Sequence, residues 1–189
     1  MLNHYLRFHA NPTLNYTILL IISTGMLLGL GPLVVEMKGQ MPITVQSLVV
    51  LFVSIAFGWR VGLPAVLIYV LCGALGLPVF AGYNSGYKVF FGPFGGFFFG
   101  FIAASIVSGF LAELEAFKKA IPAMMNWFAG HAIILILGMI WMIQFNPEGW
   151  KSMMSDLIPG AVIKSVFGAL VISLIIRLMT KEKKEAFKD

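Results

Sequence analysis

The chain has 189 residues, of which 59% are hydrophobic and only 11% are charged. Soluble domains carry about 25% charged residues, so this composition excludes an ordinary water-soluble fold and predicts an integral membrane protein. The 13 Lys and Arg residues give a formal net charge of +5, but they are scattered through short breaks between apolar runs and the C-terminal tail, which argues against a nucleic-acid groove.

Apolar runs of spanning length recur along the chain at 14–33, 43–59, 61–79, 94–112, 123–145 and 157–179. Because a transmembrane helix takes about 20 mostly apolar residues, each run predicts one membrane-spanning helix. The predicted fold is therefore an all-α bundle of six transmembrane helices that forms a single domain over residues 1–189. Residues 1–13 and 180–189 are expected to be tails outside the bilayer, the second of them basic.

Small residues mark faces where helices can approach closely. Gly25 and Gly29 stand four residues apart in the first run, and we expect them to dock a partner subunit. Two longer rows with the same spacing are expected to pack inside the bundle. They consist of Gly96, Gly100, Ala104 and Ser108 in the fourth run, and of Ala161, Ser165, Ala169 and Ser173 in the sixth.

Gly58, Trp59 and Arg60 leave little more than a short hinge between the helices of the second and third runs. A break this short predicts that the two helices form an antiparallel hairpin. Gln46 is a polar residue near the other end of the second run, and it is a candidate ligand contact.

The connection between the third and fourth runs is polar and rich in glycine. Residues 81–88 read AGYNSGYK, and they offer amide, phenol and ammonium groups on a backbone that glycine allows to turn tightly. The candidate binding residues in this loop are Gly82, Tyr83, Asn84, Tyr87 and Lys88. The phenylalanines that follow, in residues 90–99 (FFGPFGGFFF), either face lipid or wall an apolar pocket.

Groups for catalysis are sparse. His131 is the only histidine within a predicted helix, which is too little for a zinc site, and the sequence has no Gly-rich phosphate loop. We therefore expect no enzyme activity, no metal and no cofactor.

Lys164 lies inside the sixth run, where a lysine costs about 2.5 to 3.5 kcal/mol on insertion scales and indicates a functional site. With Pro159 and Gly160 predicted to start the helix, Lys164 would lie one turn in, where the helix dipole favours an anionic ligand group. Snorkelling to the interface is the competing interpretation. Asp156 is expected either to pair with Lys164 or to accept hydrogen bonds from a polar ligand head.

The cations set the predicted orientation. With the N-terminus in the cytoplasm, the inner breaks and tails hold nine Lys and Arg residues and the outer breaks hold three. Both termini are therefore predicted to be cytoplasmic. The outer connections are longer and rich in Gly, Pro, Asn and Tyr, so a ligand site is expected to open outward.

Four stretches in chain order resemble the successive signatures of the BioY family, the biotin-binding S components of energy-coupling-factor (ECF) vitamin transporters. They are residues 42–48 (PITVQSL), 73–82 (GALGLPVFAG), 92–97 (GPFGGF) and 159–164 (PGAVIK). The match runs across most of the chain, and the second stretch is fairly specific.

The resemblance implies an S-component-like, multi-pass subunit in the cell membrane that captures biotin from outside. It also implies a transmembrane coupling subunit and a pair of ATPases as partners in many organisms, which agrees with the missing phosphate loop. Binding roles carry over to Gly82, Asn84 and Lys164.

This chain departs from the family pattern at three positions. Members often have Asp after the Pro-Gly pair where this chain has Ala161, and Thr and Tyr where it has Phe94 and Phe97. The lost carboxylate leaves open which residue contacts the ureido ring of biotin. Replacement by Asp156 and an altered ligand selectivity are the alternatives.

The sequence-based hypothesis is uptake of biotin without chemical change. Biotin has a carboxylate for a cation, an apolar chain and ring for an aromatic wall, and a ureido head for donors and acceptors. The competing hypotheses are an S component for another small vitamin, and a membrane enzyme or assembly subunit. The residues leave open whether the chain transports alone, with ATPase partners or as a homo-oligomer.

Overall fold

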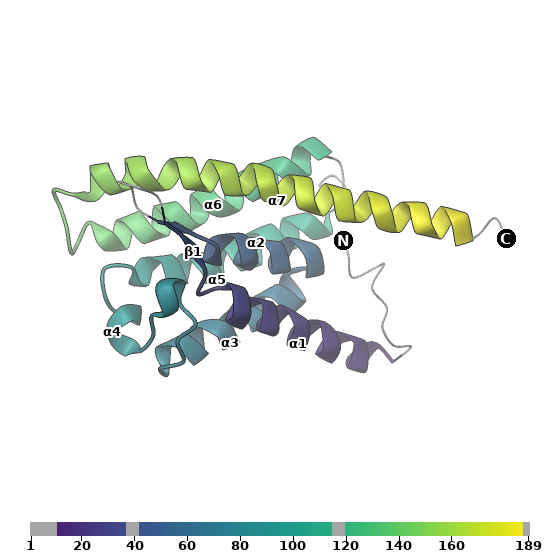
Figure 1. Cartoon of the computed structure of the whole chain (residues 1–189), viewed down its shortest axis with the longest axis horizontal. Coiled ribbons are helices and arrows are strands. Elements are labelled where there is room, and N and C mark those ends of the chain that lie inside the picture. The colour runs from purple at the N-terminus through teal and green to yellow at the C-terminus, as the bar shows by residue number, and fades with distance from the viewer. Residues whose placement is uncertain (1–10, 37–41, 115–119, 187–189) are drawn as a thin grey trace.

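The computed structural model describes residues 11–36, 42–114 and 120–186. Within these ranges the chain is almost entirely helical, as the composition predicts, and the long helices lie along one axis (Figure 1). The elements are α1 (Pro12–Leu30), β1 (Val34–Val35), β2 (Ile43–Thr44), α2 (Gln46–Phe57), α3 (Trp59–Ala74), the 3₁₀ helix η2 (Ala81–Tyr83), α4 (Tyr87–Phe90), α5 (Gly95–Glu113), α6 (Ala120–Met142) and α7 (Trp150–Ala186).

The connections gather at the two ends of the bundle. The antiparallel pair β1–β2, the short helix α4 and the α6–α7 connection lie at the left of Figure 1, whereas α1 begins and α7 finishes at the right. The left-hand connections are the ones that the sequence predicts to be outer and ligand-binding. The elements that could hold a ligand are therefore brought together at one end.

Four of the helices in the described part of the chain, α1, α5, α6 and α7, are long and apolar enough to cross a membrane. The helices α2 and α3 have 12 and 16 residues and are shorter than the predicted runs. The second run loses its first residues to β2, and α3 ends at Ala74, close before the positive φ of Gly76 at 109°. The predicted hairpin is confirmed, because Gly58, with φ at 88°, separates α2 from α3 by one residue.

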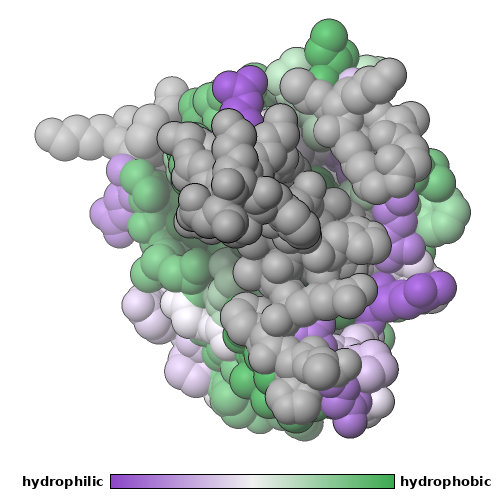
Figure 2. All heavy atoms as spheres, turned by 90° about the vertical axis from the view of Figure 1, so that its right-hand side faces the viewer, coloured by the Kyte–Doolittle hydropathy of each residue, from purple (hydrophilic) through white to green (hydrophobic). Residues whose placement is uncertain are grey.

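Apolar side chains cover much of the outside of the bundle. Ile21, Leu71, Phe110, Ile140 and Leu170, from five different helices, are each more than half exposed. Figure 2 looks along the bundle from its right-hand end and shows apolar residues along the left and lower edges. A circumference of this kind suits hydrocarbon and not water.

The helix of the sixth apolar run, α7, begins earlier than predicted. The turn residues end at Gly149, whose backbone N–H donates to Oδ1 of Asn146 at 2.9 Å, and α7 starts at the next residue. The prediction that Pro159 starts the helix is wrong, because a proline inside a helix removes only one backbone donor and can be accommodated. At its other end α7 continues through the predicted tail to Ala186.

The two long rows of small residues pack inside the bundle, as predicted. A side chain at Gly96 would meet Trp141 of α6, and one at Gly100 would meet the backbone of Ile134. The buried members of the row in α7 are Ala161, Ser165 and Ala169. These glycines let α5 and α6 approach closely, so they fix the position of the helices behind the candidate site.

Gly100→Ala is expected to destabilise the protein by about 1 to 3 kcal/mol, because its Cβ would lie 2.9 Å from Cα of Ile134. For a chain of this size the melting temperature should fall by roughly 2 to 10 °C in detergent, measured by scanning fluorimetry. Gly25→Ala is the matched control, since nothing lies within 4 Å of its Cβ position. Equal melting temperatures for the two variants would contradict the packing assignment.

Candidate functional site

A cavity of about 310 Å³ lies between β1, β2, α2, η2 and the helices α5, α6 and α7. Its volume is at the lower end of the range of small-molecule pockets, about 300 to 1,000 Å³. Segments far apart in the sequence contribute to it, from Val34 in β1 to Lys164 in α7. The cavity is therefore a product of the whole fold and not of one loop.

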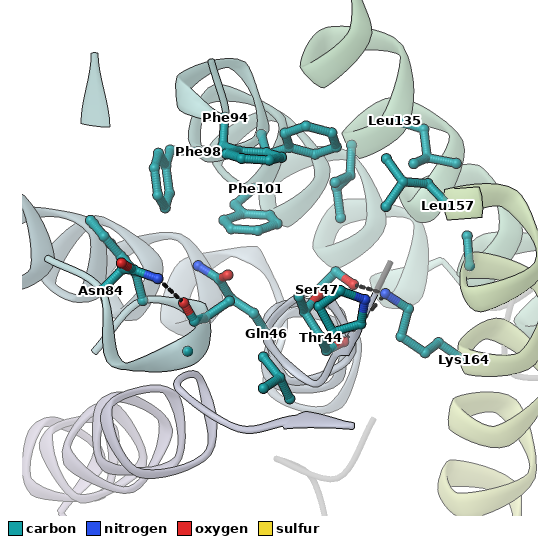
Figure 3. A pocket seen from close by; sticks show the side chains of 18 of the residues that line it. Thr44, Gln46, Ser47, Asn84, Phe94, Phe98, Phe101, Leu135, Leu157 and Lys164 are labelled. Carbon is teal, nitrogen blue, oxygen red and sulfur yellow. Dashed lines mark hydrogen bonds between the residues drawn. The ribbon is translucent and has the colours of Figure 1, made fainter. Parts of the chain in front are cut away.

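One wall of the cavity is aromatic (Figure 3). The ring centroids of Phe80 and Phe98 are 4.2 Å apart, and those of Phe98 and Phe101 are 5.9 Å apart. The phenylalanines that line the cavity are Phe80, Phe94, Phe97, Phe98 and Phe101. Both interpretations of the phenylalanine-rich stretch hold, for different residues, since Phe91 and Phe99 are exposed on the outside at 60% and 43%.

Lys164 supplies the cation of the cavity. Its Nζ donates to Oγ of Ser47 at 2.7 Å and to the backbone carbonyl of Thr44 at 3.4 Å (Figure 3). The side chain is partly buried and reaches across from α7 toward the start of α2. Both of these acceptors, which belong to described residues, are neutral. A ligand oxygen would therefore be a favourable further partner for the ammonium.

The helix dipole does not act on Lys164 in the way that the sequence predicts. Because α7 begins at Trp150, Lys164 lies several turns into the helix, and dipole effects fall off within the first turn. The attraction for an anionic or polar oxygen must come from the ammonium and from Ser47.

The predicted residues Gly82 and Asn84 also line the cavity. Asn84 lies on the side opposite Lys164 (Figure 3). Nδ2 of Asn84 donates to the carbonyl of Ala81 at 2.7 Å, and this bond holds the amide at the turn. The turn needs Gly82 because its φ is 68°, and its N–H donates to the carbonyl of Pro32 at 2.9 Å. The loop is thereby tied to the end of α1.

Gln46 is the third predicted residue that lines the cavity with a polar side chain. It is 6% exposed, and its Nε2 makes no hydrogen bond to the described residues. The nearby hydroxyl of Tyr69 donates instead to the carbonyl of Val79 at 2.9 Å. An unpaired buried amide nitrogen is costly, and a ligand acceptor beside Nε2 would remove that cost.

Four predicted residues are not among those that line the cavity. The side chains of Tyr83 and Tyr87 are 64% and 66% exposed, and Lys88 and Asp156 are exposed as well. Tyr83 lies between Gly82 and Asn84, and Lys88 and Asp156 directly precede Val89 and Leu157, which all line it. The role of the four residues in binding stays a prediction.

Ser47, Thr44 and His131 line the cavity but were not predicted as binding residues. Ser47 and Thr44 lie beside Gln46 in the stretch 42–48, which was a usable signal. For His131 the sequence offers no such signal, because a single histidine in a helix does not indicate a binding site. Among the described residues no group of three or more His, Cys, Asp or Glu could hold a metal ion.

Comparison with known proteins gives a consistent picture. The family model described as the BioY family matches residues 9–181. The biotin transporter BioY2 of Lactococcus lactis subsp. cremoris is 34% identical over 134 residues, which cover 70% of this chain and 72% of the relative. The biotin transporter BioY of Thermotoga maritima is 34% identical over 160 residues, which cover 82% and 88%.

A solved structure shares the fold. The crystal structure of the S-component for biotin from an ECF-type ABC transporter has a TM-score of 0.67 to this chain. The match covers 90% of this chain and 95% of the other, at 23% sequence identity. The bundle seen here is therefore the fold of an S component.

Proposed function

Because the chain belongs to the BioY family, we propose that it is a biotin uptake subunit, which binds the vitamin and carries it across the membrane without chemical change. The protein is a multi-pass protein of the cell membrane, and its relatives are named transporters and not enzymes.

The observation that carries this function is the combination of surfaces in the cavity. An aromatic wall of five phenylalanines faces a partly buried ammonium, whose hydrogen-bond partners among the described residues are neutral. The apolar chain and the thiophane ring of biotin can pack against the aromatic wall, and its oxygen atoms can accept hydrogen bonds from the ammonium. The polar groups available for the remaining atoms are those of Gln46, Asn84 and the backbone at Gly82.

We extend the proposal to topology and partners. All six long apolar runs cross the membrane within one domain over residues 1–189, and both termini are cytoplasmic, as the cations favour. The site at the left of Figure 1 then faces outward. An ECF coupling subunit and a pair of ATPases supply the energy, and the exposed face of α1 at Gly25 and Gly29 docks the coupling subunit.

Biotin binding by the purified chain is the direct test. We expect one biotin per protein with a Kd below about 1 μM in detergent, measured by isothermal titration calorimetry. A thermal-shift panel of other water-soluble vitamins should give no stabilisation comparable with that from biotin. A folded sample that responds to a different vitamin and not to biotin would contradict the proposed ligand.

A further inference from the structure

His131 is a buried polar residue of the cavity that the proposed function leaves without a role. It lies on α6, is 3% exposed and lines the same cavity as Lys164. Its Nε2 is buried and has no hydrogen-bond partner among the described residues. A buried ring nitrogen without a partner is costly, and a ligand that supplies the partner removes that cost.

The other ring nitrogen of His131 is held by α7 and by its own helix. Nδ1 lies 2.8 Å from Oγ of Ser165 and 3.2 Å from the carbonyl oxygen of Trp127. Oγ of Ser165 in turn donates to the carbonyl of Ala161 at 2.8 Å. The hydroxyl proton of Ser165 has carbonyl acceptors in Ala161 and, at 3.4 Å, in Trp127. Because the Trp127 carbonyl beside Nδ1 can only accept, a proton on Nδ1 gives both of its neighbours a donor.

This arrangement makes Nε2 a hydrogen-bond acceptor. In a neutral imidazole one nitrogen carries the proton and the other offers a lone pair. A second proton would place a cation in a cavity that already contains the ammonium of Lys164, and the described residues that line the cavity include no carboxylate. His131 is close enough to Lys164 for the two to interact electrostatically.

Lys164 and His131 line the cavity from neighbouring helices, and the second of them carries the unpaired Nε2. Lys164 donates to an oxygen, and Nε2 of His131 requires an N–H group. A carboxylate next to Nε2 would bring two sets of lone pairs together, whereas a ureido group carries its carbonyl oxygen between two N–H groups. The ring of Trp127 stacks on the imidazole, with centroids 6.4 Å apart, and helps to keep its orientation.

We propose that His131 is a specificity-determining residue, which accepts a hydrogen bond through Nε2 from a ureido N–H of the ligand while Lys164 donates to the ureido oxygen. This inference rests on the proposed function. It assigns the ureido ring of biotin to the α6–α7 side of the cavity and leaves its carboxylate tail for the side of Gln46 and Asn84.

The test compares three ligands on two proteins. Wild type and His131→Leu are titrated with biotin, with biotin methylated on either ureido nitrogen, and with biotinamide, which lacks the tail charge. We expect His131→Leu to bind biotin about 10- to 100-fold more weakly. It should also discriminate less than wild type against one of the two N-methyl isomers, and should keep the wild-type ratio between biotin and biotinamide.

Two further variants separate a contact from a structural effect. His131→Gln keeps an acceptor oxygen and should recover part of the affinity and of the discrimination. Phe128→Leu, on the exposed side of the same helix, should bind all the ligands as wild type does. Melting temperatures of each variant show whether it is folded.

Three outcomes overturn the inference. The first is that folded His131→Leu binds biotin as tightly as wild type. The second is that it discriminates against both N-methyl isomers as wild type does. The third is that the ratio of its affinities for biotin and biotinamide differs from that of wild type. If His131→Leu cannot be purified, wild type that binds both N-methyl isomers as tightly as biotin also overturns it. Wild type that binds no biotin at all would contradict the proposed function itself.

Discussion

Lys164→Ala is expected to weaken biotin binding by roughly 10- to 150-fold, the range that corresponds to losing one hydrogen bond to a charged group. Within the described part of the chain, the ammonium is the one charged group that lines the cavity, and no other lining side chain there can replace it. The truncation also leaves Oγ of Ser47 without its donor at 2.7 Å. Titration calorimetry of the variant in detergent measures the change directly.

A second lysine on the same helix provides the control. Lys151 is exposed, and its Nζ lies 5.8 Å from the ring centroid of Trp150. Lys151→Ala removes the same charge from α7 and should leave the affinity unchanged. A folded Lys164→Ala protein with wild-type affinity would show that the lysine only reaches toward the interface and takes no part in binding.

Gly73→Ala should reduce the volume of the binding cavity by displacing a residue that lines it. Gly73 does not line the cavity, but a methyl group there would overlap the ring of Phe80, which does. Phe80 is 1% exposed and is enclosed by Tyr69 and Phe98, with ring centroids at 5.9 and 4.2 Å. The ring can give way mainly toward the empty space of the cavity, where it would occupy the volume meant for the ligand.

We expect Gly73→Ala to reduce biotin affinity by about 10-fold or more and to lower the melting temperature, since overpacking costs about 1 to 3 kcal/mol. The double variant Gly73→Ala with Phe80→Leu should recover much of the stability, because the smaller side chain makes room for the methyl group. Titration and scanning fluorimetry on the single and double variants test both statements. Purely additive effects would mean that the two residues do not compete for space.

The helices could be predicted from the sequence because their signal is local. An apolar run of sufficient length predicts a helix without any other information, and a short break such as the one at Gly58 predicts a hairpin. The predicted start of α7 at Pro159 is wrong because proline also occurs inside helices. Whether a helix continues through Pro159 depends on the neighbouring structure, which a single sequence does not contain.

The site was predictable in part for the same reason. Lys164 stands out because a charge in an apolar run is costly, so this single residue is enough to predict a functional site. Ser47 and His131 carry no such signal, because serine and a single histidine are common in packed helices. Their importance comes from a contact between α2 and α7 and from one between α6 and α7, more than 30 residues apart in the chain.

The length of α7 links this pocket to the lipid around the protein. Its apolar part, Trp150–Ile175, has 26 residues and spans roughly 39 Å, more than a hydrocarbon layer of about 30 Å. Bilayers of different thickness must be accommodated by tilt, by bending or by local distortion of the lipid. Lys164 belongs to this helix and Ser47 belongs to α2. A tilt of α7 that adapts it to a thinner or thicker bilayer would therefore change the distance between these two groups of the cavity.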